Sequence, residues 1–473
     1  MRAHEAGALH AEAMAPGPSW LRVPEDVNAL LPRLWSRTVD RGDDGVLRVG
    51  GVSVLDLAAE HGTPAYVLDE TDLRARARAH ARAFDAAFAD LCGGADVYYA
   101  AKAFVSVAVA RWVHEEGLRL DTCTGGELAV GVRAGVPGAA MGLHGNNKSD
   151  AEIDRALAHG VGRIVVDSAE EPARIARIAR ERGVVAPVLV RVNVGVEAHT
   201  HEFIATAHED QKFGLALSDG VAAGVVADVL ARPELDLRGL HSHIGSQIFD
   251  PSGFEVAVRR LVRLHADVAR DHGVVLPEMD LGGGFGIAYS STDRPMPVED
   301  IARRLARVVA EECAAARVDV PRISVEPGRA VVGPTTFTLY EVGTVKPVTL
   351  DGGGDRTYVS VDGGMSDNVR TALYDADYSC TLASRASDAP PVMARVVGKH
   401  CESGDIVVRD EFLPADVRRG DLLAVPGTGA YCRSLASQYN HVPRPPVVAV
   451  RDGASRVLLR RETEEDVLAL DLG

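Results

Sequence analysis

Eight short β-favouring runs alternate with amphipathic helical patterns between about residues 95 and 330, and this alternation constrains the fold more than any other feature of the chain. The eight predicted strands are residues 96–101, 119–123, 139–144, 163–167, 188–193, 238–243, 278–281 and 322–326. Apolar residues recur at helical spacing in the segments between them, including 106–116, 151–159, 170–182, 254–271 and 298–315. Strands separated by helices form parallel α/β sheets, and eight regular units favour a closed (β/α)8 TIM-like barrel over an open doubly wound sheet.

A second, mainly β C-terminal domain is predicted after Arg329, where strand-like stretches punctuated by Gly, Pro and Asp replace the helical pattern. Examples are residues 336–345, 358–361, 392–397, 422–425 and 447–450. Residues 46–55 have the same character and no helical pattern, so we expect them to join that domain. The predicted organisation is a flexible N-terminal extension (1–25), an N-terminal segment joining the β domain (26–70), the barrel (71–335) and the β domain (336–473).

Composition excludes several classes of protein. At 473 residues the chain is too long for one ordinary core, and its 46% hydrophobic and 25% charged content is typical of a globular enzyme. A formal net charge of −16 argues against a nucleic-acid partner. Its six cysteines are scattered, which indicates neither a disulfide framework nor a zinc site. No stretch resembles a signal peptide or a membrane span, so we expect a cytoplasmic protein without a membrane partner.

Polar residues follow each predicted barrel strand at its carboxyl end, which is the end that carries the active site in barrels of this kind. In chain order they are Lys102, Asp121 to Cys123, His144 to Lys148, Asp167 and Ser168, Arg191 to Asn193, His241 to His243, Gly282 to Gly284, and Glu326 to Arg329. Because all eight ends converge on one rim, the sequence predicts a site large enough for a cofactor.

Lys102 is the only charged side chain in the apolar run of residues 97–105. Burial disfavours the charged form of an amine and makes it nucleophilic, so such a lysine is a candidate for a Schiff base with a carbonyl compound, most commonly pyridoxal phosphate (PLP). The alternative is a lysine whose amine simply reaches water at a strand end.

A glycine-rich turn and a carboxylate complete the candidate PLP site. Glycines at 282–284 and 286 let backbone N–H groups approach a phosphate, with Ser246 and Arg329 on neighbouring strand ends; the alternative is an ordinary turn. Glu326 ends an apolar strand and needs a cationic partner. That partner is either the pyridinium nitrogen of PLP or a barrel arginine such as Arg191.

Two histidines and a cysteine leave alternatives open. His241 and His243 have metal-ligand spacing, but no further residues complete a metal site, and one ring could instead stack on a cofactor or be satisfied inside the barrel. Cys401 lies between His400 and Glu402 in a Gly-bounded loop, where it is a candidate proton donor or nucleophile; the alternative is buried packing, which is the more common role of a lone cysteine. A further glycine-rich loop carries Tyr431, whose phenol could contact phosphate.

Several long motifs resemble the PLP-dependent decarboxylases of the alanine racemase fold type, and most closely the diaminopimelate decarboxylase family. The resemblance covers residue 60 to the C-terminus. The matching strings are Tyr-Ala-Ala-Lys-Ala at 99–103, His-Gly-Asn-Asn-Lys-Ser at 144–149, His-Ser-His-Ile-Gly-Ser-Gln at 241–247, Gly-Gly-Gly-Phe-Gly at 282–286, Glu-Pro-Gly-Arg at 326–329, His-Cys-Glu-Ser-Gly-Asp at 400–405 and Gly-Ala-Tyr at 429–431.

The resemblance implies a role for each matching residue. The implied catalytic residues are Lys102, which would bond to PLP, and Cys401, which would donate a proton. The implied PLP-binding residues are Lys102, His243, Ser246, Gly283, Gly284, Glu326, Gly328, Arg329 and Tyr431, with His243 stacked on the ring and Glu326 on its nitrogen. The implied substrate-binding residues are Arg329, Arg370, Tyr374, Glu402 and Tyr431.

The resemblance further implies a carboxy-lyase that converts meso-2,6-diaminopimelate to L-lysine and CO2, the final step of lysine biosynthesis. It also implies a homodimer in which Cys401 and Glu402 serve the partner's active site. Related decarboxylases of ornithine, arginine or carboxynorspermidine are the nearest alternative. A racemase of the same fold, a non-catalytic homologue and a metal-dependent barrel hydrolase using His241 and His243 are the others.

Overall fold

The computed structural model describes residues 17–196, 212–217, 220–250, 252–350 and 354–473. Most of the predicted N-terminal extension, residues 1–16, therefore lies outside the described residues. The chain divides into two compact units. One, here called the barrel unit, comprises Arg74–Gly286 and Pro295–Val331; the other, the β unit, comprises Met1–Leu73, Ile287–Arg294 and Val332–Gly473.

Eight parallel strands close into a barrel, which confirms the predicted fold class. In order around the barrel they are β5 (Ala95–Ala100), β6 (Arg119–Thr122), β7 (Met141–Leu143), β8 (Arg163–Val166), β9 (Ala186–Asn193), β11 (Leu235–His241), β12 (Glu278–Asp280) and β13 (Arg322–Val325). Closure is complete because β13 pairs with β5 and β8 pairs with β9, both in parallel. A short strand, β10 (Leu215–Ala216), adds to β9. Each of the eight strands overlaps its predicted range.

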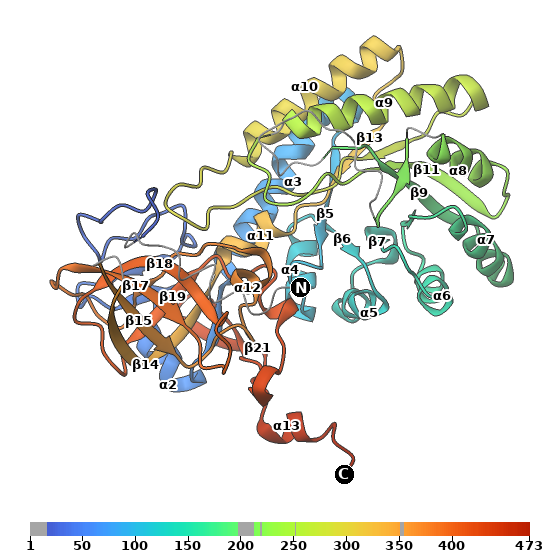
Figure 1. Cartoon of the computed structure of the whole chain (residues 1–473). Helices are drawn as coiled ribbons and strands as arrows, with labels where there is room; N and C mark the ends of the chain where they lie inside the picture. The colour runs from blue at the N-terminus through green and yellow to red at the C-terminus, as the bar shows by residue number, and fades with distance from the viewer. Residues whose placement is uncertain (1–16, 197–211, 218–219, 251, 351–353) are drawn as a thin grey trace. The chain divides into compact units, whose positions relative to one another are not determined.

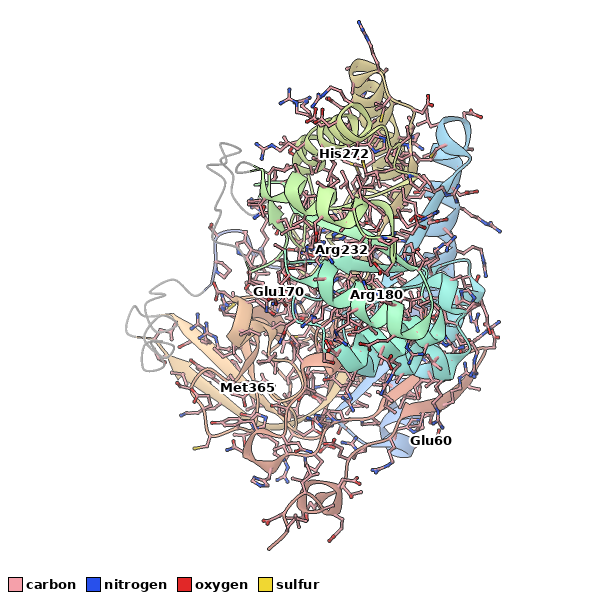
Figure 2. The ribbon with its side chains drawn as sticks, turned by 90° about the vertical axis from the view of Figure 1, so that its right-hand side faces the viewer. Glu60, Glu170, Arg180, Arg232, His272 and Met365 are labelled. Carbon is pink, nitrogen blue, oxygen red and sulfur yellow. The ribbon has the colours of Figure 1, made fainter. Side chains whose placement is uncertain are left out.

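Helices follow these strands and cover the outside of the barrel (Figure 1). They are α3 (Glu70–Cys92), α4 (Val107–Glu115), α5 (Gly125–Ala134), α6 (Asp150–His159), α7 (Glu171–Arg182), α8 (Val221–Leu230), α9 (Ser252–His272), α10 (Val298–Ala316) and the short α11 (Arg329–Val332). Exposed charged residues on this side include Arg180 on α7 and Glu170, which directly precedes that helix (Figure 2). Side chains of Ser106, Thr124 and Ser149 cap the first turns of α4, α5 and α6, so these helices begin directly at the carboxyl rim.

The β unit is built on a sheet whose strand order is β18-β17-β15-β14-β4-β20-β21, with β19 pairing β14 and β16. The strands are β4 (Ala65–Asp69), β14 (Thr336–Thr349), β15 (Asp355–Val361), β16 (Thr381–Leu382), β17 (Pro391–Val397), β18 (Ile406–Pro414), β19 (Leu422–Pro426), β20 (Val447–Arg451) and β21 (Ala454–Leu459). Two short helices, α12 (Arg370–Tyr374) and α13 (Glu464–Leu468), complete it. The mainly β character predicted after residue 329 is confirmed.

The N-terminal part of the β unit forms a small antiparallel sheet of β1 (Val39–Arg41), β2 (Leu47–Val49) and β3 (Val52–Ser53), followed by α2 (Val54–His61). The prediction that residues 46–55 contain no helix is wrong from Val54 onward. The Ser53 side chain accepts the N–H of Asp56 and caps the helix, and Val54 and Leu57 are buried in the core of the unit. None of the described helices combines the length and the apolar character that crossing a bilayer requires.

Candidate active site

Lys102 lies just past the end of β5, at the carboxyl rim of the barrel. Its Nζ is 3.4 Å from Oδ2 of Asp121, the penultimate residue of the neighbouring strand β6. The Lys102 side chain is 38% exposed, whereas that of Asp121 is fully buried. The Lys102 side chain is thus partly open to solvent at the rim, as expected for a lysine whose amine reaches water at a strand end. The buried Asp121 carboxylate fixes the direction in which that amine points.

Glu326 follows β13 and is buried beside two histidines from other strands. His144 Nε2 lies 3.0 Å from its Oε1, and His241 Nε2 lies 3.2 Å from its Oε2. Burial alone raises the pKa of Glu326, but His144 and His241 more than offset this and hold the pKa well below its usual value. His144 Nε2 is also 3.3 Å from Asp121 Oδ1, so one imidazole joins the lysine pair to Glu326.

The arginine nearest to Glu326 is Arg163, at the start of β8, and not Arg191 as the sequence suggested. Arg163 Nη2 lies 3.7 Å from Glu326 Oε1. Arg191 instead pairs with Asp167 at 3.5 Å. The sequence missed Arg163 because nothing in an isolated strand shows which interior side chains of other strands it will meet.

His243 lies beside the glycine-rich turn, and its Nδ1 accepts the N–H of Gly283 at 3.3 Å. Desolvation, together with the positive charges of Lys102 and Arg191, lowers the pKa of His243 well below its ordinary value. The ring is therefore neutral at physiological pH. A flat, neutral imidazole of this kind can stack on an aromatic ring.

The turn that follows β12 has no room for side chains. A Cβ on Gly283 would lie 2.1 Å from the backbone O of Glu326. Gly284, with φ of +115°, would place a Cβ 2.4 Å from the backbone O of Gly245. A Cβ on Gly328 would lie 2.9 Å from the backbone O of Ala100. Glycine is required at these positions because the backbones pack closely and leave no space for a Cβ.

Ser246 and Arg329 lie together beside this turn, since Arg329 Nη2 donates to Ser246 Oγ at 2.8 Å. A hydroxyl and a guanidinium next to a glycine turn form an anion-binding arrangement. The structure therefore brings together, in the barrel unit, every residue of that unit for which the sequence predicted a cofactor role: Lys102, His243, Ser246, Gly283, Gly284, Glu326, Gly328 and Arg329.

The geometry also allows a metal, with a different ligand set from the one that the sequence suggested. One ligand atom each from His144, His241 and Glu326 lies within 4.8 Å of the others, and all three residues are buried. His243 is not a member of this group. Arg163, 3.7 Å from Glu326, places a positive charge beside the same carboxylate and disfavours a cation there.

The other predicted site residues belong to the β unit. Arg370, at the start of α12, is buried; its Nη1 donates to Tyr378 Oη at 2.5 Å, and its guanidinium lies 4.3 Å from the ring centre of Tyr289. Tyr374, at the end of the same helix, is exposed. Tyr431 has a φ of +60° in the loop after β19, an uncommon backbone conformation for a bulky residue.

Cys401 and Glu402 are both exposed at the surface of the β unit. The backbone N–H of Cys401 donates to Asn440 Oδ1 at 3.2 Å, and the neighbouring His400 is buried with its Nε2 2.9 Å from Ser366 Oγ. The alternative of a buried packing cysteine therefore does not hold for Cys401.

The chemistry of the barrel rim fits PLP. Glu326 Oε1 is a buried carboxylate oxygen with no hydrogen-bond donor in good geometry, as a ring N–H would require. A nucleophilic amine, a neutral imidazole and a glycine cradle with Ser246 and Arg329 supply the remaining contacts that an aldehyde, an aromatic ring and a phosphate need.

Known proteins match this chain closely. The model of the pyridoxal-dependent decarboxylase family, pyridoxal binding domain, matches residues 74–333. The diaminopimelate decarboxylase of Mycobacterium tuberculosis (strain ATCC 25618 / H37Rv) is 55% identical over 447 residues, covering 94% of this chain and 98% of that protein. The one of Mycobacterium leprae (strain TN) is 52% identical over 478 residues, covering 100% of both.

The fold matches as well. The crystal structure of diaminopimelate decarboxylase from M. jannaschii in complex with L-lysine superposes with a TM-score of 0.85 at 29% identity, covering 93% of this chain and 98% of that one. The barrel unit is thus a PLP-binding domain. With relatives above 50% identity over nearly their whole length, the chain belongs to the diaminopimelate decarboxylase family of pyridoxal-dependent decarboxylases.

Proposed function

We propose that this enzyme decarboxylates meso-2,6-diaminopimelate to L-lysine and CO2, with Lys102, Glu326 and Cys401 as its central residues. The observation that carries the proposal is the continuous arrangement of Lys102, Asp121, His144, Glu326 and His241 across the barrel interior, with neighbouring side-chain atoms 3.0–3.4 Å apart. Close relatives that carry the name diaminopimelate decarboxylase support the substrate.

Each barrel residue has a part in holding the cofactor. Lys102 Nζ would attach it covalently, and Asp121 keeps that amine directed over the rim. Glu326 would accept the N–H of the pyridine ring, while neutral His243 would lie against the face of the ring. When bound, PLP supplies an aromatic system that takes up the electron pair left as CO2 departs.

The phosphate would be held by Ser246, Gly283, Gly284, Gly328, Arg329 and Tyr431. The backbones of Gly283 and Gly284 lie too close to the neighbouring strand ends for any side chain, so no Cβ occupies the space beside this turn, and the Gly283 N–H itself donates to His243 Nδ1. The Arg329 guanidinium, paired with Ser246, adds the positive charge.

The distal end of the substrate carries a second amino-acid group. We assign its carboxylate to Arg329 and Arg370, because guanidinium groups bind carboxylates through two parallel hydrogen bonds. Tyr374, Tyr431 and Glu402 would contribute the remaining contacts, with Glu402 matching the distal ammonium group. Decarboxylases of ornithine or arginine face a basic tail without a carboxylate, where two arginines would be unfavourable.

We further propose a homodimer in which Cys401 and Glu402 complete the partner's active site. Both residues are exposed on the β unit, as such a role requires. Cys401 Sγ would deliver the proton that replaces the departed carboxyl group at the α-carbon, so that the product is an amine. We also propose the cytoplasm as the compartment in which this step of lysine biosynthesis takes place.

A substrate panel tests the activity. CO2 release from meso-diaminopimelate, ornithine, arginine and carboxynorspermidine is compared for the wild-type enzyme with and without added PLP. We expect turnover of diaminopimelate alone, its loss in Lys102→Ala, and its retention in Lys346→Ala, a lysine exposed on β14. Turnover of a polyamine precursor without diaminopimelate would refute the substrate, and unchanged activity of Lys102→Ala would refute the role of the lysine.

Mixing two inactive variants tests the shared site. In a dimer of Lys102→Ala and Cys401→Ala chains, one of the two sites would receive both wild-type residues. Equal mixing after subunit exchange should then restore about one quarter of the wild-type activity, because half of the dimers are mixed and each has one intact site. No recovery, with mixed dimers shown by a tag on one chain, would place Lys102 and Cys401 of a single chain in the same site.

A further inference from the structure

Beneath Glu326, a second layer of polar side chains fills the barrel. Ser324 and Glu326 are two residues apart and therefore point to the same side, one layer apart. Arg163 from β8 donates through Nη1 to Ser324 Oγ at 2.9 Å, and Arg163 pairs with Asp280 of β12. Asp280 also accepts from Ser324 Oγ at 2.6 Å. These three residues, here called the lower layer, are fully or almost fully buried.

Arg163 is the point at which the lower layer meets the active site. Its guanidinium lies 3.6 Å from the ring centre of Tyr98, which supports it from the β5 side. Two carboxylates approach the same nitrogen of Arg163, Nη2: Asp280 is its direct partner, and Glu326 Oε1 lies 3.7 Å away. Asp280, in turn, accepts the N–H of Gly282 at 2.7 Å, at the start of the glycine turn.

Burying an arginine costs free energy unless an opposite charge and hydrogen bonds compensate it. The interior of the barrel offers little water, so Arg163 must be compensated by the carboxylates around it. The charge of one buried arginine would be balanced by Asp280 alone, with Ser324 and the Tyr98 ring as further contacts. Its approach to Glu326 therefore has a consequence beyond folding, because it adds a fixed positive charge that no change of pH within the working range removes.

The two histidines beside Glu326 lower its pKa, but an imidazole carries a charge only when it is protonated, whereas a guanidinium is charged at any working pH. Desolvation lowers the pKa of His241, which favours its neutral form in spite of the nearby carboxylate. The other ionisable groups around Glu326 are His144 from β7, His243 after β11, Asp121 with Lys102 above, and Asp280 below. Arg163 is the one group in this set, among the described residues, whose positive charge is independent of pH.

We propose that Arg163 is a positioning residue that keeps Glu326 in its carboxylate form and turned toward the pyridine nitrogen of the cofactor. The inference rests on the proposed role of Glu326. It extends that role to Arg163, a residue that does not itself contact cofactor or substrate. Asp280 and Ser324 orient Arg163, and Arg163 in turn orients Glu326.

The test removes the charge and keeps the volume. In Arg163→Met, Glu326 loses the cation at 3.7 Å and faces an uncompensated Asp280. The pH at which Glu326 becomes protonated should rise by about 1–3 units. Infrared spectroscopy of the cofactor-free protein measures this directly, through the carbonyl band of a protonated carboxylic acid. The PLP dissociation constant, determined by absorbance at several pH values, should increase most on the acid side.

Four variants identify the cause. A band that belongs to Glu326 disappears when Glu326→Gln is added to Arg163→Met. Arg163→Lys should retain the wild-type behaviour in large part. Arg163→Met combined with Asp280→Asn should regain only part of it, because the unpaired charge of Asp280 is gone but the cation beside Glu326 is still missing. Arg238→Met, an arginine on the more exposed side of β11, serves as the matched control and should change neither the band nor PLP binding.

Two results would overturn the proposal. If Arg163→Met only lowers the melting temperature while the carboxyl band and the pH dependence of PLP binding stay as in the wild type, Arg163 has a purely structural role. If the new band persists with Glu326→Gln, it belongs to Asp280 and the arginine does not act through Glu326. Should Arg163→Met fail to fold, Arg163→Gln, which removes the charge but keeps a hydrogen-bond donor for Ser324 and Asp280, gives the same comparison. None of these measurements depends on diaminopimelate turnover, so failure of the proposed substrate would be seen separately.

Discussion

Lys148 and Glu171 form a buried ion pair at the barrel rim, and its loss should destabilise the fold more than that of any surface pair. Lys148 Nζ lies 2.7 Å from Glu171 Oε1 and donates to Gly145 O at 2.6 Å; the two side chains are 1% and 3% exposed. Glu171 Oε2 accepts the backbone N–H of Asp167 at 2.7 Å. The pair therefore ties the loop after β7 to the loop after β8. Burial lowers the pKa of Lys148, and Glu171 offsets part of that effect.

The substitution Lys148→Met keeps an unbranched chain of similar length but leaves Glu171 buried without its cation. Removing one partner of a buried pair costs about 3–5 kcal/mol of unfolding free energy. The pair Arg177 with Glu181 on α7 is a suitable control, because its side chains are 45% and 60% exposed. Such surface pairs contribute about 0–1 kcal/mol, so Arg177→Met should be nearly neutral.

The double variant Lys148→Met with Glu171→Gln separates charge from packing. A glutamine still offers an oxygen to the N–H of Asp167 but leaves no unpaired charge, so most of the lost stability should return. Chemical denaturation followed by circular dichroism gives the free energies. The reasoning is refuted if Lys148→Met costs no more than Arg177→Met, or if the double variant is as unstable as the single one. Because the same loop begins at His144, we also expect Lys148→Met to weaken PLP binding.

Two further predictions concern a glycine and a buried carboxyl group. Gly283→Ala should cost about 1–3 kcal/mol of stability and weaken PLP binding, because its Cβ would lie 2.1 Å from Glu326 O. Gly224→Ala, in the middle of α8 with no atom within 4 Å of the new Cβ, should be neutral or stabilising in the same melting and binding assays. Desolvation raises the pKa of Asp367 to about 7 from 3.8, so the folded state holds a proton that the unfolded state has lost between these pH values. Stability should thus fall by about 4 kcal/mol as pH rises from about 4 to 7, and Asp367→Asn should remove that part of the slope in denaturation curves; an unchanged slope would contradict the assignment.

The barrel could be predicted because its strands are nearly continuous apolar runs, buried on both faces, and its helices have one apolar side. The ends of strands and helices were predicted less accurately, because the local backbone geometry sets where each element begins. The predicted strand 139–144 begins only at Met141, because residues Gly138–Ala140 form a turn of 3-10 helix before it. The helix that begins at Val54 was missed because the short strand β3 runs directly into it, and Ser53 is both the last residue of that strand and the cap of the helix.

The rim residues could be listed from the sequence because the carboxyl ends of parallel strands face one side. Which of these residues contact one another could not be predicted from the sequence. His144 and His241 are 97 positions apart and Arg163 lies on another strand, yet all three approach Glu326. Such contacts depend on the stagger of strands around the closed barrel, which no local pattern contains.

The two polar layers explain how one barrel holds so many charges. Charges in it are paired between strands: buried Arg163 of β8 with Asp280 of β12 in the lower layer, and buried Asp121 of β6 with Lys102 after β5 at the rim. Glu326 lies between these layers and is flanked by imidazoles, which can either donate a hydrogen bond as neutral rings or carry charge. A carboxylate so placed has no permanent partner of its own except the more distant Arg163. A hydrogen bond from a ring N–H would therefore stabilise this carboxylate strongly. At this position, the free energy of cofactor binding offsets the cost of the buried charge.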